Sequence, residues 1–210
     1  MNDPFALLIG PTFKYVNDFK RQLEDGKSPP LVEVREELVA LLADAEQRAH
    51  SRESAADFAL AKYALVYWID EILIYSSWSH ADDWRRHILE WEFYHSNLGG
   101  EEFFEKAREA ETSPRAEALE VFFLCVALGF QGKYTHSPND LQKWAERAYA
   151  KIASVSRTTD RFLPADPRDA DLRPLAPQPG KSILLVVSIL TSITVLATLS
   201  SFLLAARWVD

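Results

Sequence analysis

The sequence is poor in cysteine, glycine and basic residues, and each shortage narrows the class of protein. Its single cysteine, Cys125, lies in the apolar run 121–128, so the chain forms no internal disulfide and fits a reducing cytoplasm. Only seven glycines, beside many Ala, Leu and Glu residues, favour helix over sheet. The 23 Lys and Arg against 31 Asp and Glu give a net charge of −8. Nucleic acid and anionic lipid are therefore poor partners, and a basic protein is a better one.

The N-terminus lacks the features of a secretory signal peptide. Met1-Asn2-Asp3-Pro4 carries no basic residue, and the apolar stretch 5–9 stops at Gly10-Pro11. We therefore expect the domain that follows to stay in the cytoplasm, where it is made.

A long apolar run near the C-terminal end of the sequence predicts a membrane anchor. Residues 183–206 contain no charged residue, proline or glycine; Lys181 precedes them and Arg207-Trp208 follow. As a helix the run would reach roughly 36 Å, enough to cross a hydrocarbon core of about 30 Å. We predict a transmembrane tail anchor over 182–206 with a short tail, 207–210, on the far side. A buried soluble helix is the alternative.

Small and hydroxyl side chains recur three or four residues apart along this predicted anchor. In lipid, such a stripe lets helix backbones approach closely. We expect the anchor to associate with other membrane helices through Thr194, Ala197, Thr198, Ser201 and Ala205.

A proline-rich segment precedes the anchor. Five of the eleven prolines fall within 164–181, among Asp, Arg and Ala residues. This composition cannot pack a core and favours an extended, semi-rigid linker. Residues 1–163 then form one domain of ordinary size that stands off the bilayer.

Residues 1–163 show helical periodicity and no sustained period of two. We predict an all-α domain of about seven helices: 5–23, kinked or split by Pro11, then 28–45, 54–75, 79–99, a short helix around 103–104, 113–130 and 137–155. The third is apolar nearly all round from Leu60 to Tyr75, so we expect it at the centre of a bundle. The fourth is expected to end at Gly99-Gly100.

Two adjacent carboxylates, Asp70 and Glu71, stand out because their helical neighbours are apolar or aromatic. Carboxylates in such a setting are costly unless a partner satisfies them. One interpretation is a docking pair for a cationic group on another subunit; the alternative is an internal salt bridge or a cap on a neighbouring helix. We expect the pair to face a partner at the rim of a groove. Trp78, in the turn 76–79, is the best candidate for an exposed aromatic contact.

Catalysis and metal binding have little support in the sequence. Adjacent helical residues point about 100° apart, so Asp70 and Glu71 do not converge on one substrate atom. Among the acidic and histidine residues of 80–87, only Asp83 and His87 have the spacing of two ligands on one helical face, and acids also stabilise a helix N-terminus. No phosphate-binding glycine loop, paired-cysteine motif or serine elbow occurs. We predict no catalytic residue, metal or cofactor.

Three motifs, in this order, resemble the DotU/TssL family of secretion-system proteins. They are Tyr63-Ala64-Leu65-Val66-Tyr67-Trp68-Ile69-Asp70-Glu71 with the following Trp78 and Trp84, then Gly99-Gly100-Glu101-Glu102-Phe103-Phe104-Glu105, then the run 119–134, which ends Gly129-Phe130-Gln131-Gly132-Lys133-Tyr134. The resemblance covers roughly residues 5–156, and the order of parts, tail anchor included, agrees.

The resemblance implies a subunit of the inner-membrane complex of a type VI secretion system, or its type IVB equivalent. It implies a cytoplasmic domain of two packed helical bundles, an IcmF/TssM-type membrane partner and contact with baseplate subunits; a homodimer is a further option. The expected protein is a non-enzymatic scaffold in the bacterial inner membrane, single-pass, with its N-terminal domain in the cytoplasm. A tail-anchored enzyme or metalloprotein, with its site between the third and fourth predicted helices, is the alternative from another class.

Two features depart from the family pattern. Many relatives carry a His-Asn-Glu-like sequence before the glycines, whereas this chain has Tyr94-His95-Ser96-Asn97-Leu98. Some relatives continue past the membrane into a peptidoglycan-binding domain, whereas this sequence ends at Asp210. We therefore expect another protein to provide the attachment to the cell wall.

Overall fold

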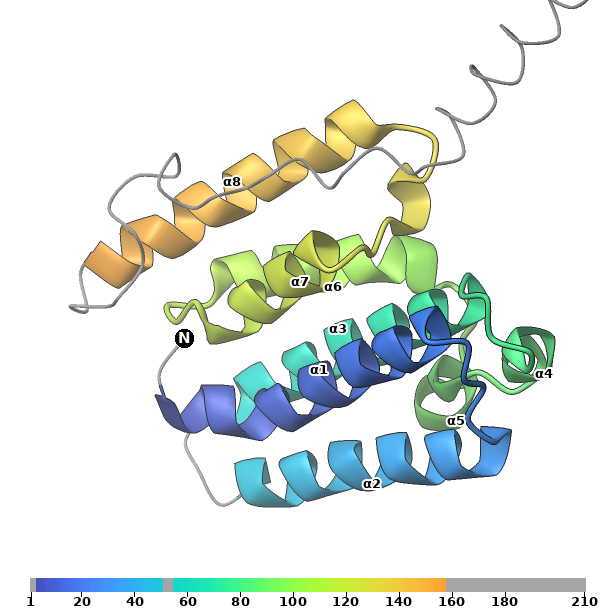
Figure 1. Cartoon of the computed structure of the whole chain (residues 1–210). Helices are drawn as coiled ribbons and strands as arrows, with labels where there is room; N and C mark the ends of the chain where they lie inside the picture. Colours follow the sequence, from blue (N-terminus) through green and yellow to red (C-terminus); the bar gives the residue numbers. More distant parts are fainter. Residues whose placement is uncertain (1–2, 51–54, 158–210) are drawn as a thin grey trace, which may run out of the picture. The chain divides into compact units, whose positions relative to one another are not determined.

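A computed structural model of the chain describes residues 3–50 and 55–157. Within these ranges the chain forms eight α-helices and one 3-10 turn, without a β-strand (Figure 1). The helices are α1 (Asp3–Glu24), α2 (Leu31–His50), α3 (Ala55–Ile74), α4 (Ala81–Arg86), α5 (Leu89–Tyr94), α6 (Gly99–Thr112), α7 (Glu117–Ala127) and α8 (Pro138–Arg157), and the 3-10 turn is η1 (Gly132–Tyr134). The expectation of an all-α domain is confirmed for the described residues.

The predicted linker, the anchor 182–206 with its five association residues, and the tail 207–210 lie outside the described residues. Among the helices of 3–50 and 55–157, none is both long and apolar enough to span a bilayer.

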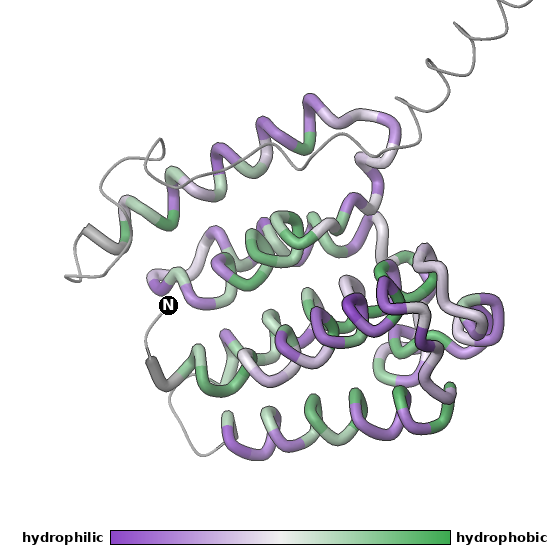
Figure 2. Tube along the Cα trace, in the orientation of Figure 1, coloured by the Kyte–Doolittle hydropathy of each residue, from purple (hydrophilic) through white to green (hydrophobic). Residues whose placement is uncertain are grey.

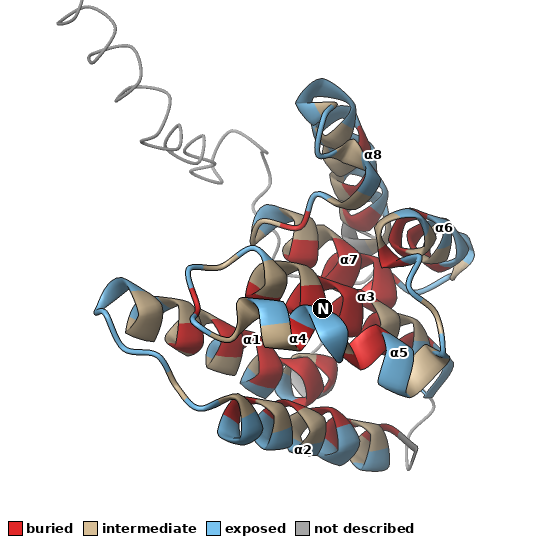
Figure 3. Cartoon of the chain, turned by 90° about the vertical axis from the view of Figure 1, so that its right-hand side faces the viewer, coloured by how far each residue is buried: buried red, intermediate tan, exposed pale blue. Residues whose placement is uncertain are grey.

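Helix α3 lies at the centre of the domain. It contacts α2, α4, α5, α6 and α7, and almost every residue from Phe58 to Asp70 is buried or nearly so (Figure 3). Its apolar surface on all sides therefore packs against helices from both halves of the sequence, as predicted. The α1–α2 pair lies on one side of α3 and the α6–α7 pair on the other, with α8 packed on α7 (Figure 1).

The outer helices are amphipathic. Polar and apolar residues alternate along α2 and α8 with helical spacing (Figure 2). In α8 the apolar stripe of Trp144, Ala148 and Ile152 is buried, while Arg147 and Lys151 are exposed. One face of α8 thus closes the core, and the other presents cations to solvent.

Pro11 does not split α1, which continues through it as one helix from Asp3 to Glu24. A proline inside a helix leaves the carbonyl four residues earlier without its usual donor. Here that carbonyl belongs to Leu7, and Arg48 of α2 donates its Nη1–H to it at 3.5 Å. A neighbouring helix therefore supplies a donor where α1 lacks its own, which sequence periodicity alone cannot reveal.

The predicted fourth helix, 79–99, is wrong in its extent. The chain forms two short helices, α4 and α5, because Ile88 is extended with φ −65° and ψ 151°. After α5, His95 adopts the left-handed conformation with φ 52°. Gly99 and Gly100 then begin α6 instead of ending a helix. The physical reason for the break is the hydrogen bonding of Asp70.

Candidate functional site

The Asp70 carboxylate is buried, with 5% of the residue exposed, and accepts three hydrogen bonds. Its Oδ1 accepts the indole N–H of Trp84 at 2.8 Å and the backbone N–H of Leu89 at 2.9 Å, and its Oδ2 accepts the backbone N–H of Glu90 at 2.8 Å. The first turn of α5 is thus capped by a side chain of α3, 19 or 20 positions earlier in the sequence. This cap fixes where α5 begins and separates it from α4.

Burial raises the pKa of Asp70 to about 6, against the lowering effect of the three hydrogen bonds. The nearby carboxylate of Glu90 raises this pKa further. Two backbone amides and an indole, and no cation of the described residues, hold the carboxylate. Asp70 is therefore a buried carboxylate with a structural set of donors.

Arg35 of α2 holds the α4–α5 corner from the other side. Its guanidinium lies over the buried Trp84 ring, 5.2 Å from the ring centroid. It also donates to the backbone carbonyl of His87 and forms an ion pair with Glu92. The corner is therefore fixed on α3 by Asp70 and on α2 by Arg35.

Glu71, the next residue, holds a different part of the chain. Its Oε1 accepts the backbone N–H of Gln131 at 2.6 Å and its Oε2 that of Gly132 at 2.9 Å. Gly132 has φ +50°, and a Cβ there would lie 2.7 Å from the carbonyl oxygen of Gly100. The turn that follows α7 is therefore both tied to α3 and packed against α6. Burial raises the pKa of Glu71, and the two amides lower it.

The two carboxylates therefore serve as caps for neighbouring elements, the alternative that the sequence left open. The expectation of a pair facing outward does not fit the structure for Asp70. This residue is buried, and both of its carboxylate oxygens accept hydrogen bonds from groups within the domain. Glu71 is half-buried and both of its oxygens accept backbone amides. Carboxylates are usually exposed, but that of Asp70 is a buried hydrogen-bond acceptor.

The expectation that Trp78 is exposed is wrong, since only 3% of the residue is accessible. Its indole N–H donates to the carbonyl of Pro29 at 2.9 Å, and its ring packs edge-on against Phe19 at 5.2 Å. The segment before α2 covers the turn, and the Ser28 and Ser79 hydroxyls lie 2.6 Å apart. This packing joins residues about fifty positions apart, so the local turn sequence gave no sign of it.

Large exposed apolar side chains lie elsewhere, and among the described residues they include Leu7 on α1 and Val32 on α2. Tyr75, just past α3, is 82% exposed, and Trp91 and Leu98, on and after α5, are 58% and 57% exposed. Aromatic residues are enriched among the residues that dominate protein interfaces. The α5 region is thus a better candidate contact surface than the turn 76–79.

The acidic and histidine residues around α4 form local pairs. Asp82 pairs with Arg85 at 2.9 Å, Asp83 pairs with Arg86, and His80 Nδ1 lies 3.5 Å from an Asp83 oxygen. Over the described ranges, three His, Cys, Asp or Glu side chains do not converge on one point. Cys125 is buried, and burial raises the pKa of its thiol well above the ordinary value.

A second set of contacts ties α5 and α6 to α3. The Tyr67 hydroxyl donates to Glu102 Oε2 at 2.8 Å, and Glu90 Oε2 accepts the backbone N–H of Gly99 at 3.1 Å. A Cβ at Gly99 would lie 2.6 Å from the same Glu90 oxygen and 2.9 Å from the Tyr67 ring, so both side chains would have to shift to accept one. The Gly99-Gly100 pair is therefore a packing contact as well as a helix start.

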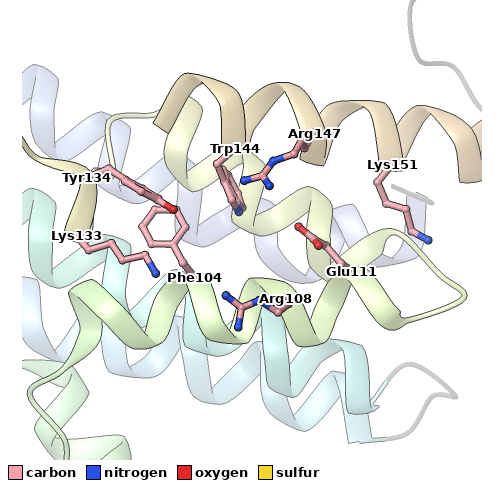
Figure 4. A pocket seen from close by; sticks show the side chains of 8 residues that line it. All are labelled: Phe104, Arg108, Glu111, Lys133, Tyr134, Trp144, Arg147 and Lys151. Carbon is pink, nitrogen blue, oxygen red and sulfur yellow. The ribbon is translucent and has the colours of Figure 1, made fainter. Parts of the chain in front are cut away.

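A cationic groove lies between α6, η1 and α8 (Figure 4). Its cavity measures about 310 Å³, and its lining includes Arg108, Lys133, Arg147 and Lys151. Sequence periodicity does not reveal this groove, because its cations come from three separate elements.

Comparison with known families gives the assignment. The sequence model of the family described as "Type VI secretion system protein DotU" matches residues 4–208. The chain belongs to the DotU family. The resemblance recognised from the sequence motifs is thus confirmed, and this DotU protein is a component of a secretion system of the type VI or type IVB kind. Comparison with curated proteins gives no match.

Solved structures agree with the family assignment. The cytoplasmic domain of TssL from Acinetobacter baumannii is 29% identical, with a TM-score of 0.65 over 72% of this DotU protein and 98% of that chain. TssL from Vibrio cholerae (20% identity, TM-score 0.61, 73% and 99% covered) and DotU from Francisella novicida (16% identity, TM-score 0.54, 75% and 99% covered) share the fold.

Proposed function

We propose that the protein is a non-enzymatic scaffold subunit of a type VI secretion system membrane complex. In this role it joins the cytoplasmic baseplate and tail machinery to the bacterial inner membrane, together with an IcmF/TssM-type partner. The observation that carries the proposal is the extent of the family match, which continues past the helical domain to residue 208 and so includes the apolar run 183–206. A single-pass anchor, with the helical domain in the cytoplasm, is consistent with that run.

The use of the interior carboxylates supports a scaffold over an enzyme. Asp70, Glu71 and Glu90 each accept backbone N–H groups that fix a helix start or a turn. These contacts shape the surface of the domain, because they determine where α5, α6 and η1 lie. Acid–base catalysis would require these carboxylates to converge on a substrate, and metal binding would require them to converge on an ion.

We further propose that Asp70, Glu71 and Trp78 affect partner binding indirectly, by fixing the segments that carry the contact surface. Asp70 holds the α4–α5 corner, which carries the large exposed apolar side chain of Trp91. An exposed tryptophan on a short helix fixed from two sides is a preorganised anchor for a baseplate subunit.

The test compares three forms of the protein in cells that lack their own copy. One is the full chain, one ends at residue 163, and one carries residues 183–206 replaced by a leucine-rich span of equal length. We expect the full chain to fractionate with the inner membrane, to co-purify with the IcmF/TssM-type protein and to restore secretion. The chain ending at 163 should do none of these, and the leucine-rich form should reach the membrane without restoring the complex. Secretion restored by the form ending at 163 would overturn the proposal.

A further inference from the structure

The groove between α6, η1 and α8 has a rigid aromatic floor. Phe104 and Trp144 are 3% and 5% exposed, and their rings meet edge to face at 5.2 Å. Tyr134 packs edge-on against Phe104 at 4.6 Å. Figure 4 shows the three rings near one another, between Lys133 and Arg147. They come from α6, η1 and α8. Phe104 and Trp144 are almost fully covered and hold the groove in shape, and the half-buried Tyr134 ring is the aromatic surface of the groove that a ligand can contact.

The rim of the groove is cationic. Arg108, Lys133, Arg147 and Lys151 line it together with one acid, Glu111. On a chain with a net charge of −8, this is a local reversal of sign. The cations come from α6, η1 and α8, so the fold brings together charges that are scattered in the sequence.

Part of this positive charge is not neutralised within the described domain. Arg108 and Lys133 share Glu105, with Lys133 Nζ 3.9 Å from its Oε1. Arg147 and Lys151, four residues apart on α8, have no Asp or Glu oxygen within 4.0 Å among residues 3–50 and 55–157. Like charges at this spacing disfavour the helix slightly unless an anion binds them.

We propose that this groove binds an acidic peptide segment of another protein, with an aromatic or aliphatic side chain packed beside the half-buried Tyr134 ring. Carboxylates of the segment would pair with the rim cations, for which the arginine fork is well suited. A cavity of about 310 Å³ is at the lower end of the size of binding sites, and suits one large side chain with its flanking backbone.

A peptide fits these features better than a lipid surface or a nucleic acid. A peptide can enter the groove as far as the half-buried Tyr134 ring, whereas a flat bilayer would contact the rim charges alone. The overall acidity of the chain also opposes both polyanions. Only the source of the peptide, a partner subunit of the secretion system, rests on the proposed scaffold function.

The test uses the purified full chain in detergent and a fluorescent peptide of about ten residues, rich in Asp and Glu around one Trp. We expect binding that weakens as salt is raised. The Arg147→Glu, Lys151→Glu variant should weaken it by about tenfold or more, since it replaces two attractions by two repulsions. A peptide with Ser in place of Trp should also bind more weakly, which tests the apolar contact with Tyr134 without a change in the protein.

The matched control is Lys20→Glu with Lys27→Glu, which changes net charge equally on and just after α1. We expect this variant to bind the peptide within about twofold of the unchanged protein, and both variants to keep its melting temperature. Equal weakening in the two variants would reduce the effect to overall charge and overturn the proposal.

Absence of peptide binding would also overturn the proposal. So would groove-dependent binding of phosphatidylserine vesicles or single-stranded DNA in place of the peptide. The binding assay does not depend on secretion. A chain that binds the peptide but does not restore secretion would therefore contradict the scaffold function and leave the peptide site in place.

Discussion

Asp70 and Glu71 are neighbours in sequence, yet each fixes a different part of the domain on α3. Asp70 accepts the backbone N–H groups of Leu89 and Glu90 at the start of α5, and Glu71 accepts those of Gln131 and Gly132 at the start of η1. The rotation of about 100° between adjacent helical residues separates the two directions. One dipeptide on the central helix thus positions the α4–α5 corner and the turn after α7.

Replacing Asp70 by Asn is expected to destabilise the domain. The amide has one acceptor oxygen for Trp84 and Leu89, and it presents an N–H₂ group to the N–H of Glu90, so a buried donor loses its partner. The expected loss is about 1–3 kcal/mol in the free energy of unfolding. Urea unfolding of residues 1–163 at pH 7 measures it, and a stability equal to that of the unchanged domain would contradict the cap.

The ionisation of Asp70 should make stability depend on pH. Its pKa in the folded domain is raised from 3.8 to about 6, so between these values the folded state binds more protons than the unfolded state. The contribution is therefore fully present below about pH 4 and is lost as pH rises to about 6. The stability of the unchanged domain relative to Asp70→Asn should fall over this range, by at most about 3 kcal/mol. Urea titrations at half-unit pH steps measure the difference, and a rise with pH would contradict it.

The outline of the fold can be predicted from the sequence. The features that differ from the prediction depend on contacts between residues far apart in the sequence. The apolar surface of α3 was sufficient to place it at the centre. The break between α4 and α5 was missed, because it depends on Asp70, 19 positions before Leu89. The burial of Trp78 was missed because it depends on Pro29, 49 positions earlier. The cationic groove likewise joins residues from three elements that periodicity treats separately.

Gly132 should tolerate alanine poorly. Its φ of +50° disfavours a side chain, and a Cβ would lie 2.7 Å from the Gly100 carbonyl oxygen and 2.9 Å from the Phe130 ring. Gly132→Ala should lower the free energy of unfolding by more than about 1 kcal/mol. The control is Gly10→Ala in α1, where a Cβ meets nothing within 4 Å. The gain in helix propensity is offset there by Pro11, whose ring crowds a Cβ on the preceding residue, so Gly10→Ala should change the free energy of unfolding by less than about 1 kcal/mol. Equal losses at the two sites would contradict the packing.

Trp78 and Trp91 should differ in stability and binding. Trp78→Phe removes a buried hydrogen bond to Pro29 and should lower stability by about 1–3 kcal/mol. Trp91→Ala removes an exposed ring and should change stability by less than about 0.5 kcal/mol. It should nevertheless reduce capture of baseplate subunits in a pull-down with the full chain. Full capture by the Trp91→Ala protein would remove α5 from the proposed contact surface.

The predicted anchor offers a test that does not depend on the helical domain. At 100° per residue, Ala197, Ser201 and Ala205 fall on one face of a helix, where small side chains allow close helix contact. Each interhelical hydrogen bond in lipid contributes only about 0.6 kcal/mol. Single changes to Leu should therefore act weakly, and the triple change to Leu should disrupt co-purification with the IcmF/TssM-type partner.

The control for this variant changes hydroxyl residues on the opposite face, Ser188→Leu with Ser192→Leu. Both proteins keep an apolar run long enough to span a bilayer, so both should fractionate with the membrane in equal amounts. Only the triple variant should lose the partner, because only its leucines hold the two backbones apart. Unchanged co-purification in the triple variant, or equal loss in both variants, would show that this face of the anchor does not carry the association.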